Sequence, residues 1–188
     1  MPIELWIVVA VGVAAAVALS VAGVLAWRRR VSRPEYALKK IAVDDLRGVL
    51  VPNGMGGHIH VDYLLLTAQG VLVIDVKEVE GVVFASDRMT DWTVIGRRGR
   101  FSFRNPQSHL YDRVAAVRQV IKDVPVAGHV LFAAGADFSK GRPKDVLLPG
   151  ELLQRYAKPD AGELERAMTA FAPYWEKIRE AVTPASTS

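Results

Sequence analysis

The distribution of apolar residues divides the chain into a short N-terminal segment and a longer remainder of mixed periodicity. Between Leu5 and Trp27 no residue is charged. A helix over residues 5–27 would be roughly 34 Å long, which is enough to cross a hydrocarbon core of about 30 Å. Glu4 is the only charge before this run, and Arg28, Arg29 and Arg30 follow it directly. The pattern predicts one N-terminal transmembrane helix.

The flanking charges also predict the topology of this segment. A cleaved signal peptide is the alternative, but its apolar region is normally about 7–15 residues long and follows basic residues. Basic residues are retained on the cytoplasmic side, so we expect the N-terminus outside and everything after Arg28 inside. This indicates a single-pass protein of a bacterial inner (cytoplasmic) membrane. It would contact lipid through residues 5–27, and Arg28, Arg29 and Arg30 would attract anionic headgroups.

Beyond residue 33 the pattern alternates between helical and strand periods. The apolar spacing predicts a first helix over residues 35–46, and a glycine-rich turn follows at 51–57. Two aliphatic strands at 58–67 and 71–77 form a tight hairpin. Later elements are short strands at 81–85, 91–95 and 101–103, a helix at 107–122, a strand at 128–134, and helices at 150–156 and 163–182.

These elements predict an α/β fold, with a mixed sheet and flanking helices, preceded by the transmembrane helix. We expect three parts: an anchor with its basic segment at 1–33, one folded domain at 34–158, and a C-terminal helix with a polar tail at 159–188. Asp160 and Glu163 have the spacing of a capping box at the start of the last helix. Pro173 is expected to kink or divide that helix.

The charge of the chain is concentrated near its predicted anchor. The chain has 24 basic and 20 acidic residues. Without Glu4 and the four arginines that precede Pro34, 20 basic and 19 acidic residues remain. The high isoelectric point is therefore no evidence for a broad nucleic-acid surface. The only dense basic cluster outside the anchor is formed by Arg97, Arg98, Arg100 and Arg104. These arginines are candidates for phosphate contacts, and a solvated turn is the alternative.

Candidate chemistry lies in the hairpin. Asp75 and Lys77 are two positions apart and so share one face of a strand, while Asp62 lies on the partner strand. Two neighbouring carboxylates can bind a hard cation such as Mg²⁺ through oxygen. A lysine beside them can orient water and neutralise charge on a phosphoryl oxygen. An exposed strand edge with a surface salt bridge is the alternative interpretation of the same residues.

Longer motifs carry a resemblance to a known family. The segments are IHVDYLLLTAQGVLVIDVKEVEG, then DWTVI, then FRNPQSHLYDRV. Their content and order resemble the nuclease-related (NERD) domain of the PD-(D/E)xK nuclease superfamily, over about residues 35–134. The resemblance implies a core like that of restriction endonucleases.

The resemblance also implies a role for individual residues. Asp62 and Asp75 match the two acidic metal ligands, which would bind Mg²⁺ or Mn²⁺, and Lys77 matches the catalytic lysine. Gln107 matches the family's glutamine at the start of the following helix. Together with Tyr111 it resembles the Gln-x-x-x-Tyr motif of RecB-type nucleases. Because one helical turn separates them, these two side chains are expected to project together toward the site.

One part of the family pattern is altered. The family usually has a Gly-x-x-Gly-Glu segment, whose glutamate begins the first helix and reaches the metal site. Here Glu35 follows Arg33 and Pro34 without the glycines. Glu35 is the candidate third metal ligand, and the change bears on activity more than on fold. His58 and His60 alternate on the strand that carries Asp62, without a third histidine or a cysteine to complete a metal site.

The expected function is metal-dependent hydrolysis of nucleic acid, DNA or RNA, on the cytoplasmic face of the membrane. A non-catalytic, membrane-anchored binding or scaffold module that keeps the fold is the main alternative. A net charge near zero favours this alternative, because affinity for nucleic acid depends on phosphate neutralisation. A membrane-assembly subunit that packs through Gly12 and Gly23 is a weaker one, since Gly-x-x-x-Gly spacing is absent.

Overall fold

The computed structural model describes residues 17–26, 32–133 and 135–185. Most of the expected transmembrane segment, residues 5–27, therefore lies outside the described residues. Residues 17–26 are helical, and their large apolar side chains, such as Leu19, are exposed. Within the described ranges, no helix combines the length and the apolar character needed to cross a membrane.

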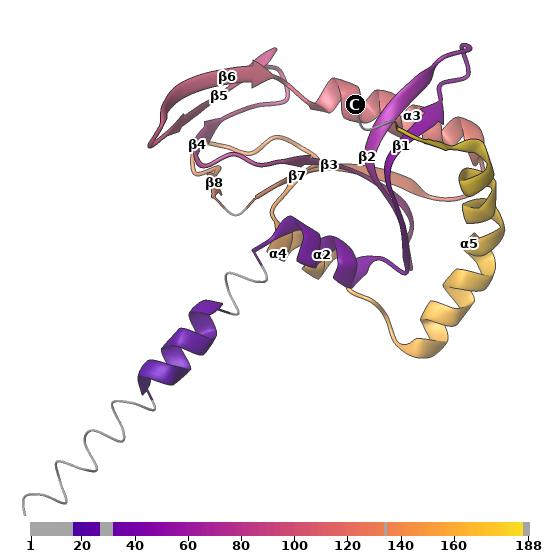
Figure 1. Ribbon diagram of the computed structural model, residues 1–188, viewed down its shortest axis with the longest axis horizontal. Helices are drawn as coiled ribbons and strands as arrows, with labels where there is room; N and C mark the ends of the chain where they lie inside the picture. The colour runs from indigo at the N-terminus through magenta and orange to yellow at the C-terminus, as the bar shows by residue number, and fades with distance from the viewer. Residues whose placement is uncertain (1–16, 27–31, 134, 186–188) are drawn as a thin grey trace, which may run out of the picture.

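A six-stranded mixed sheet forms the centre of the domain (Figure 1). The strand order is β10-β1-β2-β3-β7-β9. The pairs among β10, β1, β2 and β3 are antiparallel, whereas β3, β7 and β9 run parallel. The bounds are β1 Asp44–Pro52, β2 His58–Thr67, β3 Gly70–Lys77, β7 Val126–Phe132, β9 Val146–Leu147 and β10 Thr183–Pro184. The expected mixed α/β architecture is confirmed.

A second sheet lies beside the first and was not expected as a separate unit. Its order is β6-β5-β4-β8, with β4 at Gly81–Phe84, β5 at Asp91–Gly96, β6 at Gly99–Arg104 and β8 at Ala136–Asp137. Its attachment to the core is aromatic. The fully buried Trp92 ring lies 6.1 Å from Phe103 and 6.2 Å from Phe132 of β7, measured between ring centroids. This sheet therefore shares the main hydrophobic core.

Helices cover both faces of the central sheet (Figure 1). On one face lie α2 (Pro34–Ile41) and α4 (Pro149–Arg155), whose apolar residues pack against Leu72 and Ile74 of β3. On the other lie α3 (Gln107–Val120) and α5 (Ala161–Ala181), which pack against Val71 and Val73 of the same strand. The alternating side chains of β3 thus contribute to two separate cores. Asp75 and Lys77 follow at the C-terminal end of the strand.

Two expected boundaries were wrong. The helix expected over residues 35–46 ends at Ile41, because Ala42 is already extended (φ −69°, ψ 140°) and the Val43 amide donates to the Leu66 carbonyl at 2.8 Å. Residues after Val43 then form β1. The supposed polar tail contains β10, which pairs with Val49 and Leu50 of β1.

The C-terminal helix α5 has the expected cap at Asp160 and is not divided at Pro173. The Asp160 side chain accepts a hydrogen bond from the Glu163 amide at 2.9 Å, which confirms the predicted helix cap. The helix then continues through Pro173 without division. Trp175 and Ile178 are buried in the main core, so this helix is part of the same packed unit as the sheet.

Candidate active site

Asp75 and Lys77 lie together at the end of β3. Successive residues of a strand face opposite sides, so Asp75 and Lys77 follow Val73 onto the α3 face. The Asp75 side chain is only 3% exposed. The Lys77 ammonium donates to Asp75 Oδ1 at 2.7 Å, while a third of the lysine side chain remains accessible. A buried carboxylate thus holds a partly exposed ammonium in one orientation.

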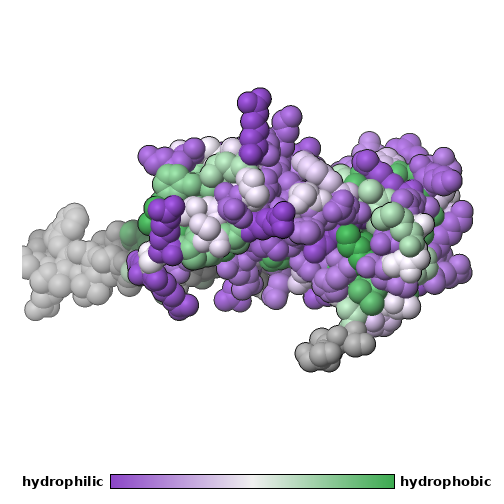
Figure 2. All heavy atoms as spheres, turned by 90° about the horizontal axis from the view of Figure 1, so that it is seen from above, coloured by the Kyte–Doolittle hydropathy of each residue, from purple (hydrophilic) through white to green (hydrophobic). Residues whose placement is uncertain are grey.

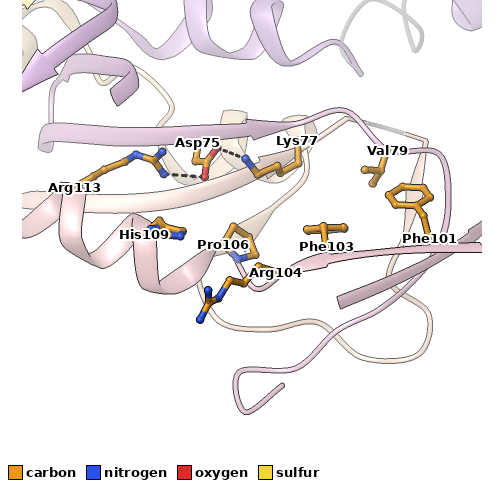
Figure 3. Close-up of a pocket in the computed structure, with 9 residues that line it drawn as sticks. All are labelled: Asp75, Lys77, Val79, Phe101, Phe103, Arg104, Pro106, His109 and Arg113. Carbon is orange, nitrogen blue, oxygen red and sulfur yellow. Dashed lines mark hydrogen bonds and ion pairs between the residues drawn. The ribbon is translucent and has the colours of Figure 1, made fainter. Parts of the chain in front are cut away.

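A second cation, Arg113 of α3, contacts the same carboxylate. Its Nη1 donates to Asp75 Oδ2 at 3.1 Å, and its Nε donates to the His60 carbonyl at 2.7 Å. Both oxygens of Asp75 therefore accept from a positively charged donor, one from β3 and one from α3 (Figure 3). These charge-assisted hydrogen bonds hold a nearly buried carboxylate in one orientation. Sequence reasoning missed Arg113, because no motif relates it to the hairpin.

Asp62 lies beside this pair in a less favourable environment. Burial raises the pKa of Asp62, and a hydrogen bond to Asp75 and the charge of Asp75 raise it further. The charges of Arg113 and Lys77 act in the opposite direction without cancelling the effect. His60 approaches from the solvent side, with Nδ1 at 3.3 Å from Asp62 Oδ1. The expected convergence of Asp62, Asp75 and Lys77 is therefore present in the structure.

The site opens into a cavity of about 370 Å³. Asp75, Lys77 and Arg113 form its polar end, and Phe101 and Phe103 of β6 line the other end with Val79 (Figure 3). Pro106, His109 and Arg104 complete the wall. Figure 2 looks down on the α3 side and shows a mostly hydrophilic face, with apolar surface over the second sheet. The cavity thus joins a charged end to an aromatic wall.

Gln107 and Tyr111 project together but not toward Asp75. The Gln107 amide nitrogen donates to Asp87 Oδ1 and to the Lys144 carbonyl, both at 2.8 Å. The Tyr111 hydroxyl donates to Asp145 Oδ2 at 3.2 Å. Burial and the charge of Asp145 raise the pKa of Tyr111. The expectation that this pair would reach the carboxylate site is corrected: it connects α3 to the loops that contain Asp87 and Asp145.

The geometry of α3 explains this separation. Leu110 and Val114 face the sheet and are buried. At 100° per residue, Gln107 and Tyr111 lie on one flank of that buried stripe, and His109 and Arg113 lie on the other. The first flank points toward the edge formed by β7 and β9, and the second toward β2 and β3. His109 and Arg113 are therefore the residues of α3 that line the cavity.

Other candidate residues are distributed differently from expectation. Glu35 is exposed on α2, which covers the face of the sheet opposite to Arg113, and its charge helps raise the pKa of Arg47. The structure does not bring it to Asp62 and Asp75. Arg104 lines the cavity, whereas Arg97 and Arg98 line a separate groove at the turn between β5 and β6. Arg100 is exposed on β6.

The donor set fits a Mg²⁺ or Mn²⁺ ion only in part. Two adjacent carboxylates, one with a raised pKa, make a site that a cation would relieve. Mg²⁺ is commonly held by one or two carboxylates, with water and substrate phosphate completing its shell. Within the described part of the chain, however, no group of three or more His, Cys, Asp or Glu residues is arranged to hold a metal. Among the described residues, Asp62 and Asp75 would therefore be the acidic ligands.

Comparison with known proteins identifies the family. Residues 31–133, more than half of the chain, match the family model described as nuclease-related domain. The chain belongs to the NERD family. The NERD match includes the hairpin with Asp62, Asp75 and Lys77 and the whole of α3 with Arg113, and it ends directly after β7.

One curated relative is similar to part of the chain and adds no function. An uncharacterized protein of Bacillus anthracis is 29% identical over 77 residues, which is 41% of this chain. The aligned region spans only 36% of that relative's length. No solved structure matches the chain at a significant level. The family membership makes the protein nuclease-related.

Proposed function

We propose that this NERD protein is a membrane-anchored, metal-dependent nuclease that hydrolyses phosphodiester bonds of nucleic acid. One observation carries the proposal: a buried carboxylate, a second carboxylate with a raised pKa and a partly exposed ammonium converge beside one open cavity. Such a juxtaposition of like charges lowers stability and is typical of functional sites. The mixed α/β arrangement of α2, β1, β2, β3, α3 and β7 also supports the proposal.

Each residue of the site has its own role in hydrolysis, which follows from its position. Lys77 orients the attacking water and neutralises charge that develops on the phosphoryl oxygen, because its ammonium lies on the cavity wall. Asp75 fixes that ammonium through the 2.7 Å contact. Arg113 holds the second oxygen of Asp75 in place. Arg113 is thus a positioning residue that acts through Asp75.

Asp62 and Asp75 would hold Mg²⁺ or Mn²⁺ at the same end of the cavity. When bound, the ion supplies Lewis-acid stabilisation of the phosphate and a more acidic water. Its charge would also lower the pKa of Asp62, which burial and Asp75 raise in the free protein. Neither Gln107 nor Glu35 contributes to this ligand set, because their side chains lie elsewhere.

The aromatic wall supplies a means to bind nucleic acid. Phe101 is 49% exposed, and its ring lies 6.3 Å from that of Phe103. Base stacking on aromatic rings is tolerant of sequence and needs only one accessible face. Arg104 on the same wall would contact a phosphate, and Arg97, Arg98 and Arg100 would extend the contact along β6 and its turn. This arrangement suits an unpaired strand of DNA or RNA.

The anchor places this activity at a bacterial inner membrane. The charge-free run between Leu5 and Trp27 and the arginines after it support a single-pass helix with its N-terminus outside. The domain from Pro34 onward would then work on the cytoplasmic face, where nucleic acid is available.

An inactive scaffold is the second candidate, and one observation favours it. Both oxygens of Asp75 already accept hydrogen bonds from cations, so a metal ion would have to bind this carboxylate next to two positive charges. In that case the Lys77–Asp75–Arg113 contacts would serve only to hold β3 to α3.

Nuclease assays with matched variants decide between the two candidates. The full-length protein in detergent is incubated with labelled single- and double-stranded DNA and RNA, with Mg²⁺, Mn²⁺ or EDTA. The variants Asp75→Asn and Lys77→Met preserve side-chain size, and the exposed Lys140→Met serves as the control. We expect metal-dependent cleavage that each site variant reduces by about 10²-fold or more, with no effect of Lys140→Met. Absence of cleavage with either metal and every substrate, by a protein that unfolds cooperatively, would support the scaffold.

A further inference from the structure

Two adjoining grooves lie on the face of the domain that carries α2 and α4. The larger has a volume of about 550 Å³ and the smaller about 440 Å³. Both are lined by Tyr36 and Lys40 of α2 and by Lys158, which follows α4. Lys39 lines the smaller groove, and Leu153 and Gln154 of α4 line the larger. The nuclease-related cavity does not share any of these residues.

The positive charge in these grooves is not neutralised. Lys39, Lys40 and Lys158 are exposed, and none forms an ion pair with a described carboxylate. On α4, Glu151 pairs with Arg142 and not with any of these lysines. The ammonium of Lys40 lies 6.0 Å from the centre of the Tyr36 ring, so an aromatic surface flanks the lysines at the groove.

The chain itself keeps this face close to the proposed membrane anchor. Helix α2 begins at Pro34, and the apolar run ends at Trp27. Six residues separate these points, and the seven Cα–Cα steps from Trp27 to Pro34 span at most about 25 Å even when fully extended. They include Arg28, Arg29 and Arg30, which continue the positive charge toward α2. The lysines of the grooves are thus held near the headgroup layer of any bilayer that the anchor crosses.

We propose that Lys39, Lys40 and Lys158 bind the phosphates of anionic phospholipid headgroups and dock the α2–α4 face onto the membrane. The inference rests on the proposed membrane anchoring and goes beyond it, since an anchor alone leaves the domain free to rotate. Basic residues close to an anionic surface are attracted within about a Debye length of roughly 8 Å. Charge complementarity together with the short tether selects lipid over a soluble anion as the occupant.

Docking in this way sets the direction of the nuclease-related cavity. Helices α2 and α4 cover one face of the central sheet, and α3 with Arg113 lies over the other (Figure 1). With the α2–α4 face against the bilayer, the cavity beside Asp75 opens away from the lipid. A nucleic acid, which anionic headgroups repel, then reaches the site from solution.

Site-directed fluorescence on the full-length protein tests the docking. The native chain has no cysteine, so Gln154→Cys places a single label in the larger groove, and Ala115→Cys places one on the exposed side of α3. Each protein is reconstituted in nanodiscs of phosphatidylcholine alone or of equal parts phosphatidylcholine and phosphatidylglycerol, with a headgroup quencher. We expect strong quenching at position 154 only with phosphatidylglycerol, and little at position 115 in either lipid.

Charge variants make the test specific. The triple substitution Lys39→Gln, Lys40→Gln and Lys158→Gln should weaken docking by about fivefold for each charge removed. The control substitution Lys122→Gln, Lys140→Gln and Lys177→Gln removes the same charge from other exposed positions and should leave quenching at position 154 unchanged. Equal quenching in both triple variants, or equal quenching in the two lipids, would overturn the proposal. Loss of quenching on adding inorganic phosphate at constant ionic strength would assign the grooves to a soluble anion instead.

Flotation with liposomes in alkaline carbonate tests the membrane anchor separately from the docking. A chain that floats but shows no quenching at position 154 is anchored and does not dock. A chain that fails to float lacks the anchor, and the docking proposal then falls with it.

Discussion

Asp62 is the residue at which function and stability conflict. Burial raises the free-energy cost of ionising its carboxyl group, and the neighbouring carboxyl group of Asp75 adds to this cost. Its pKa is raised above the ordinary value, so ionisation of Asp62 lowers the stability of the metal-free fold at neutral pH. Such a cost persists at a site only where the charged form has a use, such as binding a cation.

This conflict leads to opposite effects of one substitution. Asp62→Asn should abolish metal-dependent cleavage and at the same time raise the Tm of the metal-free protein at pH 7. An increase of about 1 kcal/mol corresponds to roughly 2–4 °C in a chain of this size. The gain should shrink as the pH falls through the raised pKa of Asp62, because the wild-type carboxyl is then neutral as well. Scanning calorimetry with EDTA measures this, and Asp91→Asn, at an exposed position, is the control. A lower Tm for Asp62→Asn would show that neighbouring cations compensate the negative charge of Asp62 in the wild-type protein.

The residues of the site differ in how well the sequence predicts them. Asp62, Asp75 and Lys77 follow from the alternation of two strands in one hairpin, which is a local property. Arg113 does not, because its contact depends on where α3 crosses β2 and β3. The direction of Gln107 fails for the same reason. One helical turn correctly places it with Tyr111, but the side of the buried stripe on which both lie is set by tertiary packing.

At the scale of elements, the contact between α3 and β7 positions Arg113. This contact is close because Gly128 of β7 has no side chain. A Cβ added there would lie 2.5 Å from a Val114 methyl carbon and 3.1 Å from a Leu110 methyl carbon. Both contacts are shorter than ordinary van der Waals separations, so a larger residue must push α3 away from the sheet.

Gly128→Ala should therefore destabilise the protein and disturb the site. We expect a loss of about 1–3 kcal/mol in the free energy of unfolding, typical of overpacking in a core. Urea unfolding measures it, and cleavage at saturating metal reports whether α3 has shifted Arg113. Gly150→Ala on α4 is the matched control, because no atom lies within 4 Å of its added Cβ. Equal stabilities of the two variants would mean that Val114 and Leu110 move aside freely.

Strong local patterns predicted their elements, and weak ones did not. The expected strands 58–67 and 71–77 agree with β2 and β3, because segments so rich in aliphatic residues strongly favour strands. Strand β1 was hidden, since its sequence DDLRGVLVP contains four charged or glycine residues in its first five positions. It is extended because β2 on one side and β10 on the other satisfy its backbone hydrogen bonds. Tertiary pairing thus overrides a weak helical periodicity.

At the scale of the whole molecule, side chains of the C-terminal helix α5 join it to the start of β1. Asp44, at the start of β1, accepts a hydrogen bond from the Trp175 indole at 2.9 Å and a charged one from Arg179 at 2.5 Å. These partners are 131 and 135 residues away in sequence. Together with the pairing of β10 and β1, these contacts connect α5 and β10 to the central sheet.

Lowering the pH should weaken the contact of Asp44 with Trp175 and Arg179. Burial tends to raise the pKa of Asp44, but the hydrogen bonds from Trp175 and Arg179 outweigh it and lower the pKa below its usual value of 3.8. A lowered pKa in the folded state contributes stability that is complete above the unfolded value and is lost as the pH falls through the folded one. The contact should therefore stabilise α5 at pH 7 and fail only in strong acid.

The variant Asp44→Asn isolates this effect. It should lower the urea midpoint at pH 7, where the wild-type carboxylate is ionised, and the difference from wild type should narrow as the pH falls below about 4. Asp123→Asn, at an exposed position, should leave the midpoint unchanged. If the deficit of Asp44→Asn is the same in acid as at neutral pH, the ionised charge of Asp44 does not account for it. A deficit that disappears in acid shows that the charge of Asp44, at the start of β1, stabilises the contact with α5.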